Sequence, residues 1–113
     1  VALRGDISFL MEIKSSNTDT LHFSSVDGKL QRQAEKMQRE CEKTGTLPVY
    51  GFRLKGHGGD SWRLFTMEIQ SLEGRAKILQ NRLPKLALSK SGNFIMRWED
   101  GLPLSDFLMY LCK

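Results

Sequence analysis

The chain has little cysteine, no long apolar run and none of the common nucleotide-binding loops. Its two cysteines, Cys41 and Cys112, form neither a CxxC unit nor a zinc-ligand spacing. The most apolar segment, 7–13, is far shorter than the ~20 residues that cross a bilayer and already contains a carboxylate. No GxxxxGKS/T or GxGxxG pattern is present. We therefore expect no membrane partner, no zinc finger and no P-loop or dinucleotide site.

With 113 residues, 40% hydrophobic and 27% charged, the sequence predicts one globular domain, 1–113. The opening residues VALR resemble the end of a strand, so we expect further residues before Val1. Cys41 falls on the apolar stripe of a predicted helix, which favours a buried free thiol and a reducing, cytoplasmic compartment.

The charge is unevenly distributed. The net charge is +4, and the stretch 74–93 contains basic residues but no acidic ones, whereas acids gather in 27–42. This layout suits a face that binds a polyanion such as DNA. A solvated surface with chance clustering of charge explains it equally well at this point.

The first predicted element is a strand. Ile7, Phe9, Met11 and Ile13 alternate with more polar residues, and the period of two indicates a strand with one strongly apolar face. The Gly5-Asp6 turn before it predicts a β-hairpin with VALR. We interpret the strand as an interior one because its apolar face is continuous.

A helix is predicted next, from Asp27-Gly28 to about Lys43, with Gly45 as its C′ residue. An apolar stripe with helical spacing supports it: Leu30, Ala34, Met37 and Cys41. Two strands, 48–54 and 62–69, follow around the glycine-rich loop 55–61. The stretch 71–80 suggests a helix, 93–98 a short strand, and 103–112 a terminal helix with Leu104, Phe107, Leu108 and Leu111 facing inward. This order predicts an α/β fold with a mixed β-sheet flanked by helices.

Glu12 and Lys14 are the strongest candidates for chemistry. Because side chains alternate along a strand, the two point to one face, ~6–7 Å apart. A carboxylate can hold Mg²⁺, with Mn²⁺ as an alternative, and a lysine can orient the attacking water or offset charge on a phosphate. The main-chain carbonyl of Ile13 is a further oxygen ligand between them. E-x-K alone is a weak signal, since it occurs on many solvent-facing strands.

A metal site for phosphodiester cleavage needs more than one carboxylate. Asp6 shares strand parity with Glu12 but lies ~20 Å away along an extended chain, too far for one ion. We therefore expect the partner carboxylate just before Val1, on the neighbouring hairpin strand. Gln33, at the margin of the helix's apolar stripe, is a candidate to reach the strand end, although a plain surface role fits its spacing as well.

Taken together, these residues resemble the archaeal-type Holliday junction resolvases, which also occur in viruses and phages. The resemblance runs from VALRGDISFLMEIKSS through LQRQAEKMQRECEKTG to PVYGFRLK, and loosely to WEDGLPLSDFL. It implies a restriction-endonuclease-like PD-(D/E)xK core and a Mg²⁺-dependent homodimer that nicks four-way DNA junctions. Glu12 matches the family's metal-binding carboxylate, Lys14 its catalytic lysine and Gln33 its motif glutamine. The family's N-terminal helix with a glutamate, and an aspartate before the position of Val1, are not in this sequence.

A junction resolvase should read branch shape and backbone charge instead of base sequence. The predicted phosphate contacts are Lys29, Arg32, Arg53, Lys55, Arg75, Lys77, Arg82 and Lys85, and the basic run extends to Lys90. A dimer interface or the monomer core would equally explain a further apolar set, namely Phe94, Met96, Trp98, Leu104, Phe107 and Leu108.

Other functions stay open. A related nuclease of the same fold would act on other branched, nicked or duplex DNA. A non-catalytic domain would bind junctions whether or not Mg²⁺ is chelated. A protein-interaction domain would use the basic run for an acidic partner, without the steep salt dependence of DNA binding.

Overall fold

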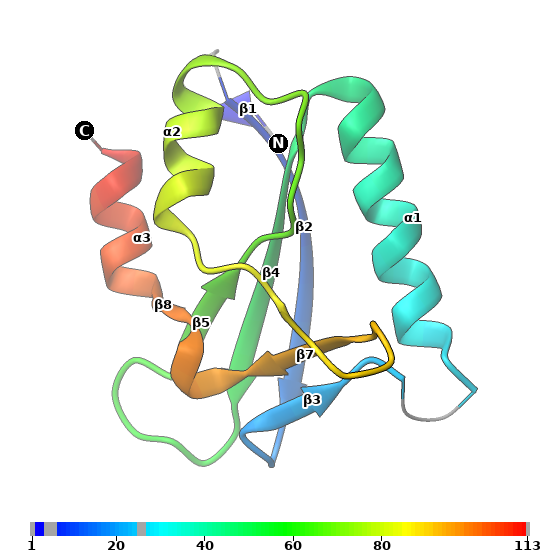
Figure 1. Ribbon diagram of the computed structural model, residues 1–113. Coiled ribbons are helices and arrows are strands. Elements are labelled where there is room, and N and C mark those ends of the chain that lie inside the picture. The colour runs from blue at the N-terminus through cyan, green and yellow to red at the C-terminus, as the bar shows by residue number, and fades with distance from the viewer. Residues whose placement is uncertain (1, 4–6, 25–26, 113) are drawn as a thin grey trace.

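The protein is an α/β fold built on a mixed five-stranded sheet, with a second sheet of three strands packed against it (Figure 1). The computed structural model describes residues 2–3, 7–24 and 27–112. The main sheet has the strand order β1-β2-β4-β5-β8 and the small sheet the order β3-β7-β6. None of the helices in these ranges is long and apolar enough to cross a membrane.

The predicted hairpin and crossover are present. Strand β1 (Ala2–Leu3) pairs antiparallel with β2 (Ile7–Ser16), and β2 pairs in parallel with β4 (Leu47–Leu54). Helix α1 (Lys29–Thr44) connects these two parallel strands, as a crossover helix does. The predicted Gly5-Asp6 turn lies outside the described residues.

The residues predicted to begin and end α1, Asp27-Gly28 and Gly45, lie at its two ends. The carboxylate of Asp27 accepts a hydrogen bond from the backbone N–H of Lys29 at 3.1 Å. At the other end Gly45 has a φ of 65°, the left-handed conformation for which glycine carries no steric penalty. Ala34, Met37 and Cys41 are buried, as the apolar stripe predicts.

The third long strand is shorter than predicted. β5 (Trp62–Phe65) pairs antiparallel with β4 across the loop 55–61, but it ends before residue 69. Beyond Phe65 the backbone no longer pairs with β4. The N–H of Thr66 donates to the carbonyl of Pro84 at 2.9 Å, and the Thr66 carbonyl accepts from the N–H of Leu86 at 3.0 Å.

Helix α2 (Gly74–Arg82) is displaced from the predicted range 71–80. Its end has a local cause. Leu83 precedes Pro84 and is extended, because a proline ring clashes with a helical conformation of the residue before it.

The predicted strand 93–98 exists as β7 (Phe94–Arg97), but it belongs to the small sheet, between β3 (Thr20–His22) and β6 (Ala87–Leu88). After β7 the chain forms a short 3-10 helix, η1 (Trp98–Asp100), and then β8 (Leu102–Pro103), which pairs with β5 at the sheet edge. Helix α3 (Leu104–Leu111) ends the described chain.

The helices cover opposite faces of the main sheet (Figure 1). On one face α1 and the small sheet pack over Tyr50, whose ring lies edge-on to Phe23 at 5.4 Å. On the other face α2 and α3 pack over Ile7 and Phe9, and the Phe9 ring lies 6.1 Å from that of Phe107. Candidate residues on different faces are therefore separated by the sheet and cannot belong to one site.

One prediction about the packing of β2 is corrected. The apolar face of β2 is covered only in its first half, because Met11 and Ile13 are 44% and 53% exposed. Strand β2 lies between β1 and β4 in the main sheet, although among the described residues β1 pairs with it only at Ile7 and Ser8. The prediction of an interior strand is therefore confirmed by the strand order, whereas the expected close packing of its whole apolar face is not.

The apolar set weighed for a dimer interface is divided. Met96, Trp98 and Phe107 are buried in the monomer core. Phe94 and Leu104 are partly buried, whereas Leu108 is 51% exposed and does not face inward as predicted. Leu111 packs partly against the core. Three of these residues are thus unavailable to a partner.

Candidate functional site

Glu12 and Lys14 lie on the face of the main sheet that α1 covers. They stand beside Tyr50 and Phe52 of β4 in the parallel register. Both β4 side chains are buried, whereas Glu12 and Lys14 are half-buried. The strand therefore presents a carboxylate and an ammonium group on one face, at the border between core and solvent.

A hollow of about 280 Å³ lies between β2 and α1 and brings Glu12 together with Gln33. Its lining combines apolar and ionisable side chains: Leu10, Met11, Glu12, Gln33, Lys36, Met37, Glu40 and Tyr50. The carboxylate of a strand and the amide of the following helix thus face one space. Lys14 lies two residues further along β2 and is not part of this lining.

Gln33 reaches the hollow because of its place on the helix. Gln33, Lys36 and Glu40 are three and four residues apart, so they follow one another along a single face of α1. Gln33 was predicted from the sequence and Lys36 and Glu40 were not, although the same helical spacing contained the signal for all three.

Tyr50 is the second feature that the sequence argument missed. Its side chain is buried, it lies beside Glu12 on the neighbouring strand, and it lines the hollow. Burial raises the pKa of the Tyr50 hydroxyl well above its usual range, and the negative charge of Glu12 raises it further. Tyr50 is therefore a neutral phenol at any physiological pH, able to donate a hydrogen bond and unable to act as an anionic ligand.

Ile13 turns its side chain to the opposite face of the sheet. Its Cδ1 atom lies 3.2 Å from where a side chain on Gly51 would begin, so the small residue on β4 makes room for it. Ile13 can therefore offer a cation only its main-chain carbonyl oxygen, which is the group predicted from the sequence.

The oxygen donors at the hollow are of the right chemistry for a hard cation. A carboxylate and an amide oxygen, from Glu12 and Gln33, are ligands that Mg²⁺ accepts. Over the described residues, however, no three His, Cys, Asp or Glu side chains gather closely enough to hold a metal ion. Glu12 therefore fits as one ligand of a metal site and does not complete one. Asp6 lies outside the described residues.

A neighbouring glutamine has a structural role. Gln31 is buried, its Oε1 accepts a hydrogen bond from the Phe94 N–H at 2.7 Å, and its Nε2 donates to Glu35 at 3.1 Å. This contact ties α1 to β7 of the small sheet and fixes the helix over the candidate site. No local sequence pattern distinguishes Gln31 from Gln33, because the difference depends on β7, 63 residues further along.

The predicted phosphate-binding residues do not share one surface. Lys29 and Arg32 lie in the first two turns of α1, on the candidate-site face. Arg53 is exposed near the end of β4, on the opposite face by alternation, and Lys55 follows that strand. Both are exposed.

The basic run 75–90 is divided between the two faces. Arg75, Lys77 and Arg82 belong to α2, on the face opposite Glu12 and Lys14. Lys85 forms an ion pair with Glu68 at 3.1 Å. Lys90 lies in the turn between β6 and β7 of the small sheet. A single rigid duplex cannot cover all of these positions together with Glu12.

No protein-family model matches the chain, and no curated protein matches it either.

Proposed function

We propose that the chain is the catalytic domain of a metal-dependent endonuclease that resolves four-way DNA junctions, with a restriction-endonuclease-like core. The observation that carries the proposal is the shared hollow of Glu12 and Gln33, with Lys14 on the same face of the same strand. A carboxylate, an amide and an ammonium group on one side of a sheet form a set suited to phosphodiester chemistry.

The arrangement of elements supports the proposal. A hairpin leads into the strand that carries Glu-x-Lys, a helix follows, and the next strand runs parallel beside the first. This order is what the resemblance to the resolvases implies for the nuclease core. The helix supplies Gln33 to the site, and its first turns supply Lys29 and Arg32 as phosphate contacts.

Each residue has a distinct role in the proposed reaction. Glu12, Gln33 and the Ile13 carbonyl would hold a divalent cation, which when bound supplies Lewis-acid stabilisation of charge on the phosphate. Lys14 orients the attacking water and offsets the charge that develops on the phosphate oxygens. Tyr50, neutral and buried beside Glu12 on the neighbouring strand, borders the hollow from the β4 side.

The hairpin register says where a second carboxylate would have to lie. Ala2 pairs with Ser8 and Leu3 with Ile7, so each step back along β1 is matched by one step forward along β2. If the strand continues before Val1, its third residue upstream would stand opposite Glu12. Directly opposed residues share a face, so an acid at that position would complete the site.

The substrate class follows from symmetry and charge. A homodimer presents two copies of the site to the two opposed strands of a four-way junction, which explains paired incisions. Recognition through backbone phosphates makes branch shape, and not base sequence, the selected feature.

The test is cleavage of a labelled synthetic four-way junction beside a linear duplex of the same sequence, with Mg²⁺ or with EDTA. The chain should be assayed as residues 1–113 and together with any residues that precede Val1 in the natural protein. We expect Mg²⁺-dependent paired nicks near the branch, with the duplex spared. Glu12→Gln, prepared in parallel, excludes a contaminating nuclease.

Other results would redirect the proposal. Tight junction binding without nicks, unchanged by EDTA, would identify a non-catalytic junction-binding domain. Cleavage of linear duplex at a similar rate would identify a nuclease of the same fold with broader specificity. Absence of both binding and cleavage would refute the proposal.

A further inference from the structure

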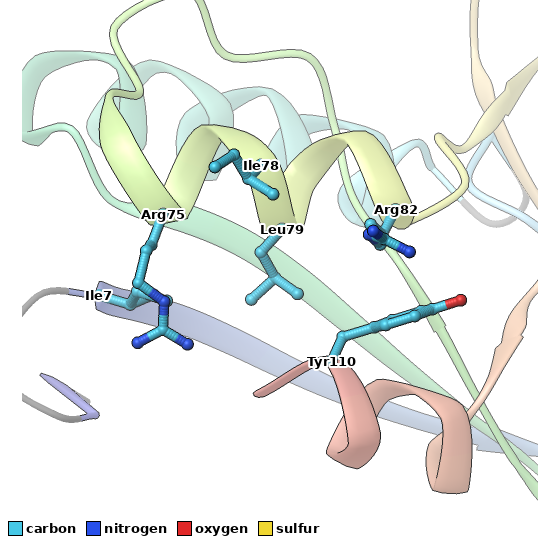
Figure 2. A pocket seen from close by; sticks show the side chains of 6 residues that line it. All are labelled: Ile7, Arg75, Ile78, Leu79, Arg82 and Tyr110. Carbon is cyan, nitrogen blue, oxygen red and sulfur yellow. The ribbon is translucent and has the colours of Figure 1, made fainter. Parts of the chain in front are cut away.

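A second hollow lies on the face of the sheet opposite Glu12, between α2, α3 and the start of β2 (Figure 2). Its volume is about 220 Å³. For comparison, a dry apolar cavity of about 150 Å³ holds a benzene molecule. The described residues that line it are apolar or basic: Ile7, Arg75, Ile78, Leu79, Arg82 and Tyr110. None of the six is acidic.

The two arginines stand at opposite ends of this hollow (Figure 2). Arg75 donates a hydrogen bond to the carbonyl of Leu111 at 3.3 Å, and the guanidinium carbon of Arg82 lies 4.8 Å from the ring centre of Tyr110. These contacts with α3 hold both guanidinium groups at the rim. A held guanidinium loses less side-chain entropy when it binds a carboxylate.

The space between the arginines is apolar. Leu79 and Ile7 are buried at its floor, whereas Ile78 is 60% exposed beside it. Arg75 and Arg82 are seven residues apart on one helix, which sets them about 10 Å apart along its axis. A complementary partner therefore carries two acids with the same separation and a large apolar side chain between them.

We propose that this hollow is a docking site for an acidic amphipathic helix of a partner protein. The helix would place one large apolar side chain in the hollow and carboxylates seven residues apart against Arg75 and Arg82, a helix-in-groove mode. Charge complementarity and the apolar lining favour a peptide over DNA, whose phosphates gain nothing from Ile78.

The position of the hollow would let a partner bind without blocking the candidate site. It lies on the face of the sheet opposite the hollow of Glu12 and Gln33, so a partner bound there leaves the candidate site open. Docking does not depend on nuclease activity, so failure of one proposal leaves the other standing.

The test uses a fluorescein-labelled, alanine-based helical peptide with Glu, Phe and Glu at positions i, i+4 and i+7. Fluorescence anisotropy measures its affinity for the wild type and for Arg82→Glu, Ile78→Glu and Lys90→Glu. We expect losses of about tenfold or more for the first two variants, equivalent to about 1.4 kcal/mol. Lys90→Glu, with the same charge change on the small sheet, should bind within twofold of the wild type.

Peptide variants give an independent readout that does not depend on the folding of a mutant. Replacing Phe by Ala, or both Glu by Lys, should each weaken binding to the wild-type protein about tenfold or more. The proposal is overturned if the peptides bind equally, or if none binds. The proposal is also overturned if Arg82→Glu weakens binding of an unbranched duplex instead, because the surface would then bind DNA. It is overturned as well if Arg82→Glu converts a dimer into monomers, because the surface would then be a dimer interface.

Discussion

Glu12 of β2 and Gln33 of α1 line the same hollow, one from the strand and the other from the helix that follows it. The helix returns over the strand because β2 and β4 are parallel and need a crossover connection. Gln31, bonded to β7, fixes the helix in that position. The closeness of Glu12 and Gln33 therefore depends on two long-range contacts, the β2–β4 pairing and the bond from α1 to β7.

Glu12→Gln and Lys14→Ala should each lower the rate of junction cleavage by about a hundredfold or more, the usual scale for a positioned catalytic group. Junction affinity should change little, because neither residue is a main phosphate contact. Gel-based cleavage and binding assays at one Mg²⁺ concentration measure both. Glu99→Gln, at an exposed position, and Lys77→Ala, on the opposite face of the sheet, are the controls. A tenfold loss of affinity in Lys14→Ala with cutting preserved would contradict its catalytic role.

Gln33→Ala should raise the Mg²⁺ concentration needed for half-maximal cleavage, since it would remove the neutral oxygen ligand that we propose beside Glu12. A Mg²⁺ titration of the cleavage rate gives the readout. Gln70→Ala, an exposed glutamine on the loop before α2, should leave the titration unchanged. If Gln33→Ala behaved like Gln70→Ala, Gln33 would be a plain surface residue.

The division of the basic residues between two faces predicts different effects on DNA binding. Lys29→Ala should reduce the slope of log K against log salt by about 0.9, because one phosphate contact is lost. Lys77→Ala, on α2, should leave the slope unchanged. Anisotropy with a labelled junction over a series of salt concentrations measures both. Equal reductions would place α2 in the DNA interface.

Stability should fall at alkaline pH because of Cys41. Burial raises the pKa of the Cys41 thiol from 9.0 to about 11, with a smaller contribution from the charge of Glu40. The contribution of the protonated Cys41 thiol to the free energy of unfolding is fully present below pH 9. It is lost as the pH rises toward 11, because the thiol ionises in the unfolded chain before it ionises in the folded protein. The slope is at most about 1.4 kcal/mol per pH unit.

Urea unfolding at pH 8 and pH 10 tests this effect. Cys41→Ala should show a smaller loss of unfolding free energy between the two pH values than the wild type. Cys112→Ala, at the exposed cysteine, should keep the wild-type loss. The raised pKa of Tyr50 acts in the same direction, so Cys41→Ala should retain part of the fall.

Gly101 is required for steric reasons at the turn into β8. A Cβ atom there would lie 2.5 Å from the Cβ of Arg63 and 2.8 Å from the ring of Phe65. Gly101→Ala should therefore lower the free energy of unfolding by about 1–3 kcal/mol, the usual cost of overpacking. Gly58→Ala is the matched control, because a Cβ there meets nothing within 4 Å. Equal stability of the two variants in urea would contradict the packing argument.

The sequence alone determined the elements with strong local signals. The alternation of Ile7, Phe9, Met11 and Ile13 predicted β2, and Gly45 predicted the end of α1. The order of these elements predicted the parallel crossover and the mixed sheet. Such signals are readable because strand alternation, helical spacing and glycine at positive φ are properties of a few consecutive residues.

Only the tertiary structure decided what covers each face. Alternation placed Met11 and Ile13 with Ile7 and Phe9, but α2 and α3 are too short to cover all four. The small sheet depends on pairing between Thr20–His22 and Phe94–Arg97, which no local pattern reveals. The same non-local packing put the α2 arginines on the face of the sheet away from Glu12. The side of a sheet on which a helix packs depends on the apolar surface that the rest of the chain leaves uncovered, and the residues of the helix alone do not determine it.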